Sequence, residues 1–105
     1  MESQLKRGLL EVCVLAAIRD QDSYGYKIVK DLSPYIDITE PTLYPILKRL
    51  EKAGKLSAYS VEHQSRLRKY YNITQAGAKQ IADFIADWPM VEKAFQFIAG
   101  EKAHG

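Results

Sequence analysis

The sequence predicts a mainly α-helical fold with a β-hairpin wing: a winged helix-turn-helix followed by a long C-terminal dimerisation helix. Three observations predict it. Two short amphipathic helices are joined by a brief connection, the periodicity changes from helical to strand-like after Gly54, and a long final segment repeats apolar residues every three or four positions. We divide the 105 residues into a winged helix-turn-helix domain, residues 1–74, and a C-terminal helix with a short tail, residues 75–105.

The first two predicted helices span residues 4–19 and 24–32. The second half of the first helix is apolar nearly all round, which indicates burial on more than one side. Asp22 or Ser23 is expected to cap the second helix. Cys13 lies in the apolar run of the first helix and is the single cysteine of the chain, so we expect a buried structural thiol.

The predicted third helix, which ends before Gly54, has two different faces. On a helical wheel at about 100° per residue, leucine and isoleucine gather on one side and basic, aromatic and proline residues on the other. The helix begins either at Thr42, with Pro45 in its first turn, or at Thr39, with Pro45 inside it. The apolar set is Leu43, Ile46, Leu47 and Leu50, and the outer set is Pro41, Tyr44, Pro45, Lys48 and Lys52.

A helix with one apolar face and one basic, hydrogen-bonding face fits the major groove of DNA. The alternative is an ordinary solvated helix face. Tyr44 either contacts DNA or packs on the second helix, and Lys48 is expected to contact a phosphate, which positions the protein without specifying a sequence. The predicted DNA-contacting residues of this segment are Thr39, Thr42, Tyr44, Pro45, Lys48 and Lys52.

Residues 56–62 and 67–73 are predicted strands because they are rich in β-branched and aromatic residues, and residues 63–66 form the turn between them. Tyr70 and Tyr71 point to opposite faces of a strand, so one of them belongs to the core. Cations near the tip can reach phosphates or the minor groove, which makes the hairpin a wing; the alternative is a solvated hairpin tip. These cations are Arg66, Arg68 and Lys69.

The last predicted helix runs from about residue 75 to 99, a length of ~37 Å. So small a domain cannot cover it, and its apolar stripe therefore predicts a second subunit. Pro89 interrupts the stripe and is expected to kink the helix just after Trp88. The predicted dimer-interface residues are Leu9, Ile81, Phe84, Ile85, Trp88, Val91, Phe95 and Ile98.

Composition and motifs argue against an enzyme and against a membrane protein. The net charge is +2, but the cations cluster, and the acidic residues lie mostly elsewhere, notably Asp83, Asp87 and Glu92 near the C-terminus, which favours an anionic partner on one side. His63 and His104 lack neighbours at metal-ligand spacing, and neither a phosphate-binding loop nor a nucleophile elbow occurs, so we expect no metal and no cofactor. A signal peptide and an apolar run of ~20 residues are both missing, which predicts a cytoplasmic protein.

Several short motifs, in order, resemble the PadR family of bacterial transcriptional regulators over nearly the whole chain. The resemblance implies a homodimeric repressor that binds a partly palindromic operator. The single long C-terminal helix is similar to the smaller subgroup, in which the first and last helices form the dimer interface. The wing turn, Gln64–Ser65, lacks the glycine that many members carry. The motifs are Gly8-Leu9-Leu10, Tyr24-Gly25-Tyr26, Thr42-Leu43-Tyr44-Pro45, Leu47 with Arg49-Leu50-Glu51 and Gly54, Arg68-Lys69-Tyr70-Tyr71, and Thr74 with Gly77.

The resemblance also implies a ligand. Trp88 lies where multidrug-responsive members of the subgroup carry a tryptophan that stacks on planar aromatic ligands in a pore at the dimer centre. Pro89 beside it alters or closes such a pore, and the alternative is a structural interface tryptophan. Two function classes remain: a ligand-responsive DNA-binding repressor, and a winged-helix protein-interaction adaptor without DNA binding. The basic outer face of residues 41–52 and the arginine-bearing wing favour the repressor.

Overall fold

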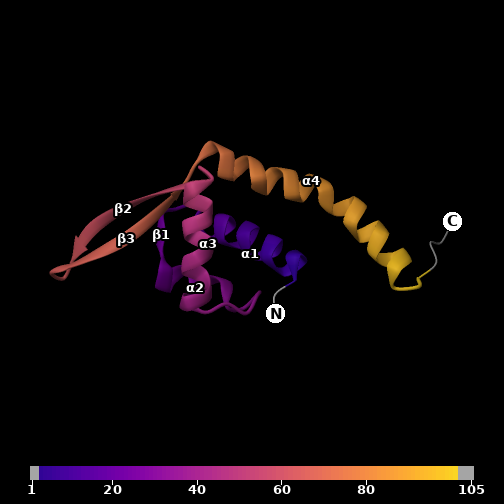
Figure 1. Cartoon of the computed structure of the whole chain (residues 1–105), viewed down its shortest axis with the longest axis horizontal. Coiled ribbons are helices and arrows are strands. Elements are labelled where there is room, and N and C mark those ends of the chain that lie inside the picture. Colours follow the sequence, from indigo (N-terminus) through magenta and orange to yellow (C-terminus); the bar gives the residue numbers. More distant parts are fainter. Residues whose placement is uncertain (1–2, 102–105) are drawn as a thin grey trace.

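The computed structural model describes residues 3–101, which form four helices and one three-stranded antiparallel sheet (Figure 1). The predicted fold class, mainly α with a hairpin wing, is confirmed. The strand order in the sheet is β1-β3-β2. The elements are α1 (Gln4–Ala17), β1 (Ser23–Tyr24), α2 (Gly25–Leu32), α3 (Glu40–Lys52), β2 (Leu56–His63), β3 (Arg66–Ile73) and α4 (Gln75–Ile98).

A single apolar core lies between α1, α2, α3, the base of the sheet and the start of α4. The four side chains of α3 that were predicted to form its apolar face lie in this core, so the predicted buried face of α3 is confirmed. Cys13 is half-buried, which is less than predicted, and burial raises the pKa of its thiol. The core residues are Leu10, Val14, Leu15, Ile18, Ile28, Leu32, Ile38, Leu43, Ile46, Leu47, Leu50, Leu56, Tyr71 and Ile81.

The start of α3 settles the alternative left open by the sequence. Thr39 is the N-cap residue, so the helix begins before Thr42 and contains Pro45. The proline removes one backbone hydrogen bond, the one that would reach the carbonyl of Pro41. Both prolines lie on the exposed face, where water can take over that bond. At the other end, Gly54 has a positive φ of 76°, as the predicted C′ position requires.

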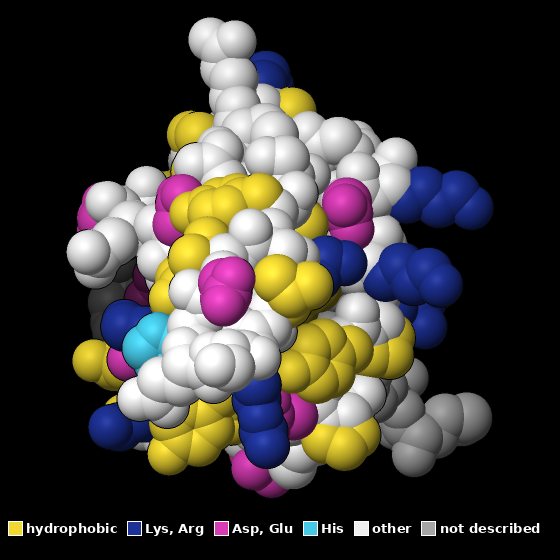
Figure 2. All heavy atoms as spheres, turned by 90° about the vertical axis from the view of Figure 1, so that its left-hand side faces the viewer, with side chains coloured by type: hydrophobic (Ala, Val, Ile, Leu, Met, Phe, Trp, Pro, Cys, Tyr) yellow, Lys and Arg dark blue, Asp and Glu magenta, His cyan; other side chains and the backbone are white. Residues whose placement is uncertain are grey.

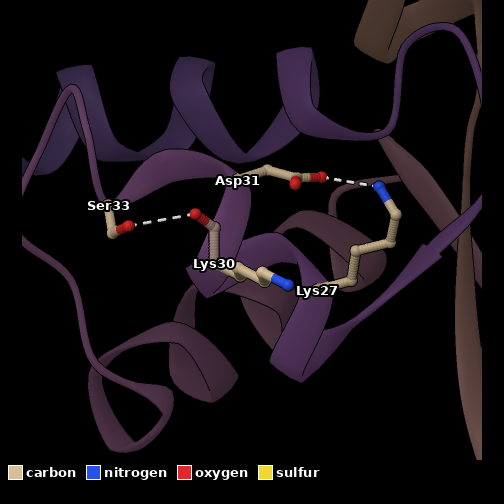
Figure 3. Close-up of polar contacts among 4 residues, drawn as sticks. All are labelled: Lys27, Lys30, Asp31 and Ser33. Carbon is tan, nitrogen blue, oxygen red and sulfur yellow. Dashed lines mark hydrogen bonds and ion pairs between the residues drawn. The ribbon is translucent and has the colours of Figure 1, made fainter.

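The second helix is capped differently from the prediction. Tyr24, not Asp22 or Ser23, is the N-cap residue of α2, because residues 23 and 24 form a short strand that pairs with β3. Along α2, Lys27 Nζ donates to Asp31 Oδ2 at 2.7 Å, and Ser33 Oγ donates to the carbonyl of Lys30 at 3.0 Å (Figure 3). Exposed pairs of this kind stabilise a helix only slightly, by about 0.3–0.5 kcal/mol.

Asp22 has a different role, which is to tie the loop before β1 to the sheet. Its carboxylate accepts hydrogen bonds from the hydroxyl of Tyr59 on β2 and from Asn72 Nδ2 on β3. Both donors stabilise the charged form, and the bond from Tyr59 makes the larger contribution, so the pKa of Asp22 lies below its usual range. The loop is thereby fastened to both long strands.

The wing is a tight hairpin with the predicted turn. Its strands extend to His63 and Arg66, which leaves Gln64 and Ser65 as a two-residue connection with φ angles of 51° and 63°. Two consecutive left-handed residues are the geometry of a type I′ turn, which normally selects Asn-Gly. A residue with a side chain costs on the order of 1–2 kcal/mol in this conformation, and the turn forms here without glycine.

The two adjacent tyrosines of β3 point to opposite faces, as predicted. Tyr71 is 4% exposed and belongs to the core. Tyr70 lies on the outer face between Tyr24 of β1 and Tyr59 of β2, with ring centroids at 5.4 and 5.8 Å respectively. Such cross-strand aromatic pairs stabilise the base of the wing by about 0.5–1.5 kcal/mol each beyond the area they bury.

The helix α4 starts tightly packed. Thr74 caps it by accepting from the amide of Gly77 at 3.2 Å, while its hydroxyl donates to the carbonyl of Gly54 at 2.6 Å. A Cβ added at Gly77 would lie 2.1 Å from the carbonyl oxygen of Lys55, so glycine is required there. Ile81 is 5% exposed and packs in the core of its own chain, which corrects its assignment to a dimer interface.

The helix α4 runs beside α1 as far as about Asp87, and beyond that point it extends away from the other elements (Figure 1). The longest dimension of the molecule is 62 Å. The helix continues through Pro89 to Ile98, and Figure 1 shows it curving along its length. Gly100, with φ of 83°, ends the helix, and the rest of the predicted tail, residues 102–105, lies outside the described residues.

Candidate nucleic-acid interface

The outer face of α3 is free of protein contacts that would bury it. All five residues of the predicted outer set are exposed. Arg49, at the edge of this face, is instead directed toward α1, where its guanidinium lies 3.5 Å from Glu11 Oε2. The basic character of the outer face therefore rests on Lys48 and Lys52, and neither forms an ion pair within residues 3–101.

A cleft of about 730 Å³ separates the start of α3 from the wing. It brings the predicted wing cations Arg66, Arg68 and Lys69 to the same hollow as Tyr44 of α3. Thr39, Thr42, Pro45, Lys48 and Lys52 do not line it. Figure 2 looks at this end of the molecule and shows Lys and Arg side chains interleaved with hydrophobic and acidic ones.

Tyr44 packs on α2 and remains partly accessible at the same time. Its hydroxyl would lie 2.6 Å from a Cβ added at Gly25, so it sits directly over that glycine, yet the side chain is 47% exposed. The hydroxyl donates to Glu40 Oε1 at 3.0 Å. Burial, followed by this hydrogen bond, raises the pKa of Tyr44, so the hydroxyl keeps its proton and remains a donor at neutral pH.

The predicted threonines lie together at the N-terminus of α3. Thr39 Oγ1 donates to Thr42 Oγ1 at 3.2 Å, and neither side chain caps the helix. Thr39 is exposed and Thr42 is half-buried. Their hydroxyls therefore stand beside the first turn of α3, next to the backbone N–H groups that a helix start leaves without partners.

Aromatic rings hold the basic side chains of the wing. The guanidinium carbon of Arg68 lies 4.2 Å from the ring centroid of Tyr24, and Lys69 Nζ lies 5.8 Å from that of Tyr71. A cation over an aromatic ring is attracted by about 0.5–1 kcal/mol at an exposed site. The contact with Tyr24 favours one position of the Arg68 side chain, and a side chain restricted before binding loses less entropy on contact with an anion.

Sequence reasoning missed three residues of this region: Tyr24, Gly25 and Glu40. The first two were quoted as a motif, but their function, to support Arg68 and to make room for Tyr44, depends on contacts between distant segments. Glu40 gave one signal that could have found it, an acidic residue at the start of an otherwise basic helix face.

A second surface, on α4 and α1, holds the remaining predicted residues. The side chains of Phe84 and Trp88 lie with ring centroids 5.6 Å apart, and Trp88 is 42% exposed. Leu9 and Phe84 are half-buried and border a shallow hollow of about 370 Å³ between the two helices. Farther along α4 the apolar residues are exposed, namely Ile85, Val91, Phe95 and Ile98.

Within the described part of the chain, no three His, Cys, Asp or Glu side chains are grouped in a way that would hold a metal ion. Among the helices of residues 3–101, none contains an apolar stretch sufficient to span a bilayer.

Comparison with known proteins identifies the family. Residues 14–83 match the model of the transcriptional regulator PadR-like family, a class of regulators and not of enzymes. The chain is 40% identical to the Streptococcus mutans protein smu.1704, with all of both chains covered and a TM-score of 0.77. It is 34% identical to a PadR family transcriptional regulator from Eggerthella lenta, covering 91% of this chain and 86% of that one, with a TM-score of 0.80. An uncharacterised Lysinibacillus sphaericus protein is 33% identical over 98 residues, 89% of this chain and 90% of that protein. Because the family model covers the helix-turn-helix, the wing and the start of α4, the chain belongs to the PadR-like family of transcriptional regulators.

Proposed function

We propose that this regulator is a repressor that binds a partly palindromic DNA operator as a homodimer. The observation that supports this best is the exposure of the outer face of α3 beside a cleft edged by Arg66, Arg68 and Lys69. A recognition helix in the major groove, with a basic hairpin beside it, would place these groups along one stretch of duplex.

The residues divide by role. Lys48, Lys52 and the wing cations contact phosphates, which give affinity without sequence preference. Thr39, Thr42, Tyr44 and Pro45 form the part of α3 closest to the base edges, since the N-terminal residues of a recognition helix read the bases. A protein-interaction adaptor is the competing function, and it would give no reason for exposed cations to surround the cleft.

The dimer would form through α1 and the distal half of α4. Phe95 and Ile98 are 60% and 78% exposed, and a contiguous exposed apolar face of this kind is characteristic of an interaction site. A two-fold axis through this surface would set the distance between two recognition helices. Half-sites for such a dimer lie about one helical turn, ~34 Å, apart.

Trp88 is the candidate contact for an effector. Its ring is partly exposed beside Phe84, and two copies facing each other across a two-fold axis would form an apolar slot for a planar aromatic molecule. Such a ligand would release the protein from DNA only if it binds more tightly to a dimer in which the distance between the two recognition helices does not fit the operator. Because the chain has one tryptophan, quenching of its fluorescence by planar aromatics, with release of DNA, tests this; no quenching across a broad panel leaves Trp88 as interface packing.

DNA binding is tested by titrating the protein with a duplex from upstream of its own gene and with a random duplex of equal length, at several salt concentrations. We expect affinity to fall steeply with salt, with a slope of about −0.9 per neutralised phosphate. Lys48→Ala or Arg68→Ala should weaken binding to both duplexes alike. Each removes one phosphate contact per protomer, so the magnitude of the slope should fall by about two for the dimer.

The matched control is Lys93→Ala, an exposed lysine on α4 far along the chain from α3 and the wing, which should leave both affinities and the slope unchanged. Binding of neither duplex, or binding that is insensitive to salt, would contradict the proposal and favour the adaptor.

A further inference from the structure

Glu40 is an acidic side chain in a cleft that otherwise presents cations. It is the first residue of α3, it is half-buried, and it lines the same hollow as Arg66, Arg68 and Lys69. An acid in the first turn of a helix is favoured by the helix dipole. The helix dipole would stabilise the carboxylate in any orientation of the side chain, so it does not explain the contacts that Glu40 makes.

One hydrogen bond orients the carboxylate. Tyr44 donates its hydroxyl hydrogen to Glu40 Oε1 at 3.0 Å, from one turn further along α3. Tyr44 is itself held, because its hydroxyl end lies over Gly25, where any side chain would collide with it. Gly25, Tyr44 and Glu40 thus form a chain of contacts from α2 to the start of α3.

The carboxylate has unused acceptor capacity. Oε2 is not engaged by any hydrogen bond within residues 3–101, and none of the ion pairs of that part of the chain includes Glu40. A bound duplex offers phosphate oxygens and base edges there, and the hydrogen-bond donors among the base edges are the amines of cytosine and adenine. Phosphate oxygens would repel a carboxylate, whereas the amine of cytosine in the major groove is a donor that glutamate accepts from.

Building on the proposed function, we propose that Glu40 is a specificity-determining residue that accepts a hydrogen bond from the N4 amine of a cytosine in each half-site. Tyr44 is its positioning residue, because it fixes one carboxylate oxygen and thereby directs the other toward the base edges. A phosphate at that position is rejected, so Glu40 contributes selectivity rather than affinity.

The experiment is selection from a library of randomised duplexes by the full chain, followed by sequencing of the bound DNA. Wild-type protein should enrich a partly palindromic sequence with a preferred cytosine in each half. For Glu40→Gln, which keeps the size and can still accept from Tyr44, the preference at that one position should fall at least about fivefold or shift to adenine, which glutamine reads. Tyr44→Phe, which removes only the hydroxyl, should weaken the preference for cytosine at the same position.

The matched control is Glu51→Gln, an exposed glutamate at the other end of α3 that does not line the cleft. It should enrich the wild-type sequence, and unchanged thermal unfolding would show that all variants fold. An unchanged preference in Glu40→Gln overturns the proposal. So does a uniform gain in affinity for every duplex, since the carboxylate would then act only by repulsion. If wild-type protein enriches no sequence, the proposed function fails as well, and the two failures are thereby distinguished.

Discussion

Apolar side chains are buried at one end of the molecule and exposed at the other. In the winged-helix part, Leu10, Leu43 and Leu47 are at most 1% exposed, and one core accounts for α1, α2, α3 and the sheet. In α4 beyond Ile81, Phe95, Phe97 and Ile98 are all at least 60% exposed (Figure 1). The difference is one of geometry, because a helix that projects past its domain has nothing of its own chain to pack against.

The comparison shows what each end needs in order to be stable. The winged-helix part buries its apolar face within one chain, so its stability is intrinsic. The distal part of α4 would need a second surface, and isolated helical segments are marginal in water without tertiary packing. Substitutions at the two ends should therefore affect different measurements: unfolding at one end, association at the other.

The largest effect is expected in the core of the winged-helix part. Leu43→Ala removes a fully buried side chain of α3 and leaves a cavity, which should lower the free energy of unfolding by about 2–5 kcal/mol. The matched control is Leu67→Ala near the wing tip, where leucine is 77% exposed and the loss should stay within about 0.5 kcal/mol. Denaturant unfolding at one fixed protein concentration measures both, and equal losses would contradict the assignment of Leu43 to the core that stabilises the winged-helix part.

The parts of the fold that sequence predicted well are those determined by local pattern. The buried face of α3 followed from its 3.6-residue period, and the hairpin from its β-branched and aromatic residues and its turn position. The strand β1 was missed because two residues carry no periodicity and their pairing is set by β3. The helix continues through Pro89, because an exposed proline removes only one hydrogen bond.

The sequence could predict which residue types make up the candidate site, but it could not predict the contacts between their side chains. Exposed positions such as Lys48 could be placed on the outer face from spacing alone. The hydrogen bond of Tyr44 to Glu40 and the stacking of Arg68 on Tyr24 could not, because they depend on side-chain rotamers and on the approach of segments far apart in sequence. Ile81 was placed at an interface for the same reason, since a stripe does not reveal where its own domain ends.

A smaller effect, on association, should distinguish the two sides of the open helix. Phe95 continues the apolar side of Trp88 and Val91 at helical spacing, whereas Phe97, two residues further at about 100° per residue, points to nearly the opposite side. If the Phe95 side packs on a second copy, Phe95→Asp places a charge in a desolvated surface. The dimer dissociation constant should then rise at least about tenfold, which corresponds to ~1.4 kcal/mol. Phe97→Asp, a change of the same chemistry at a residue that is 84% exposed, should leave the dimer dissociation constant within about twofold of the wild-type value.

Sedimentation over a range of concentrations measures both variants. A wild-type protein that stays monomeric at micromolar concentration would refute the dimer, and equal weakening by both variants would show that the partner covers the opposite side of α4 as well. Monomer formation by Phe95→Asp should leave the core of residues 4–81 folded, because the buried side chains of that part are enclosed within one chain.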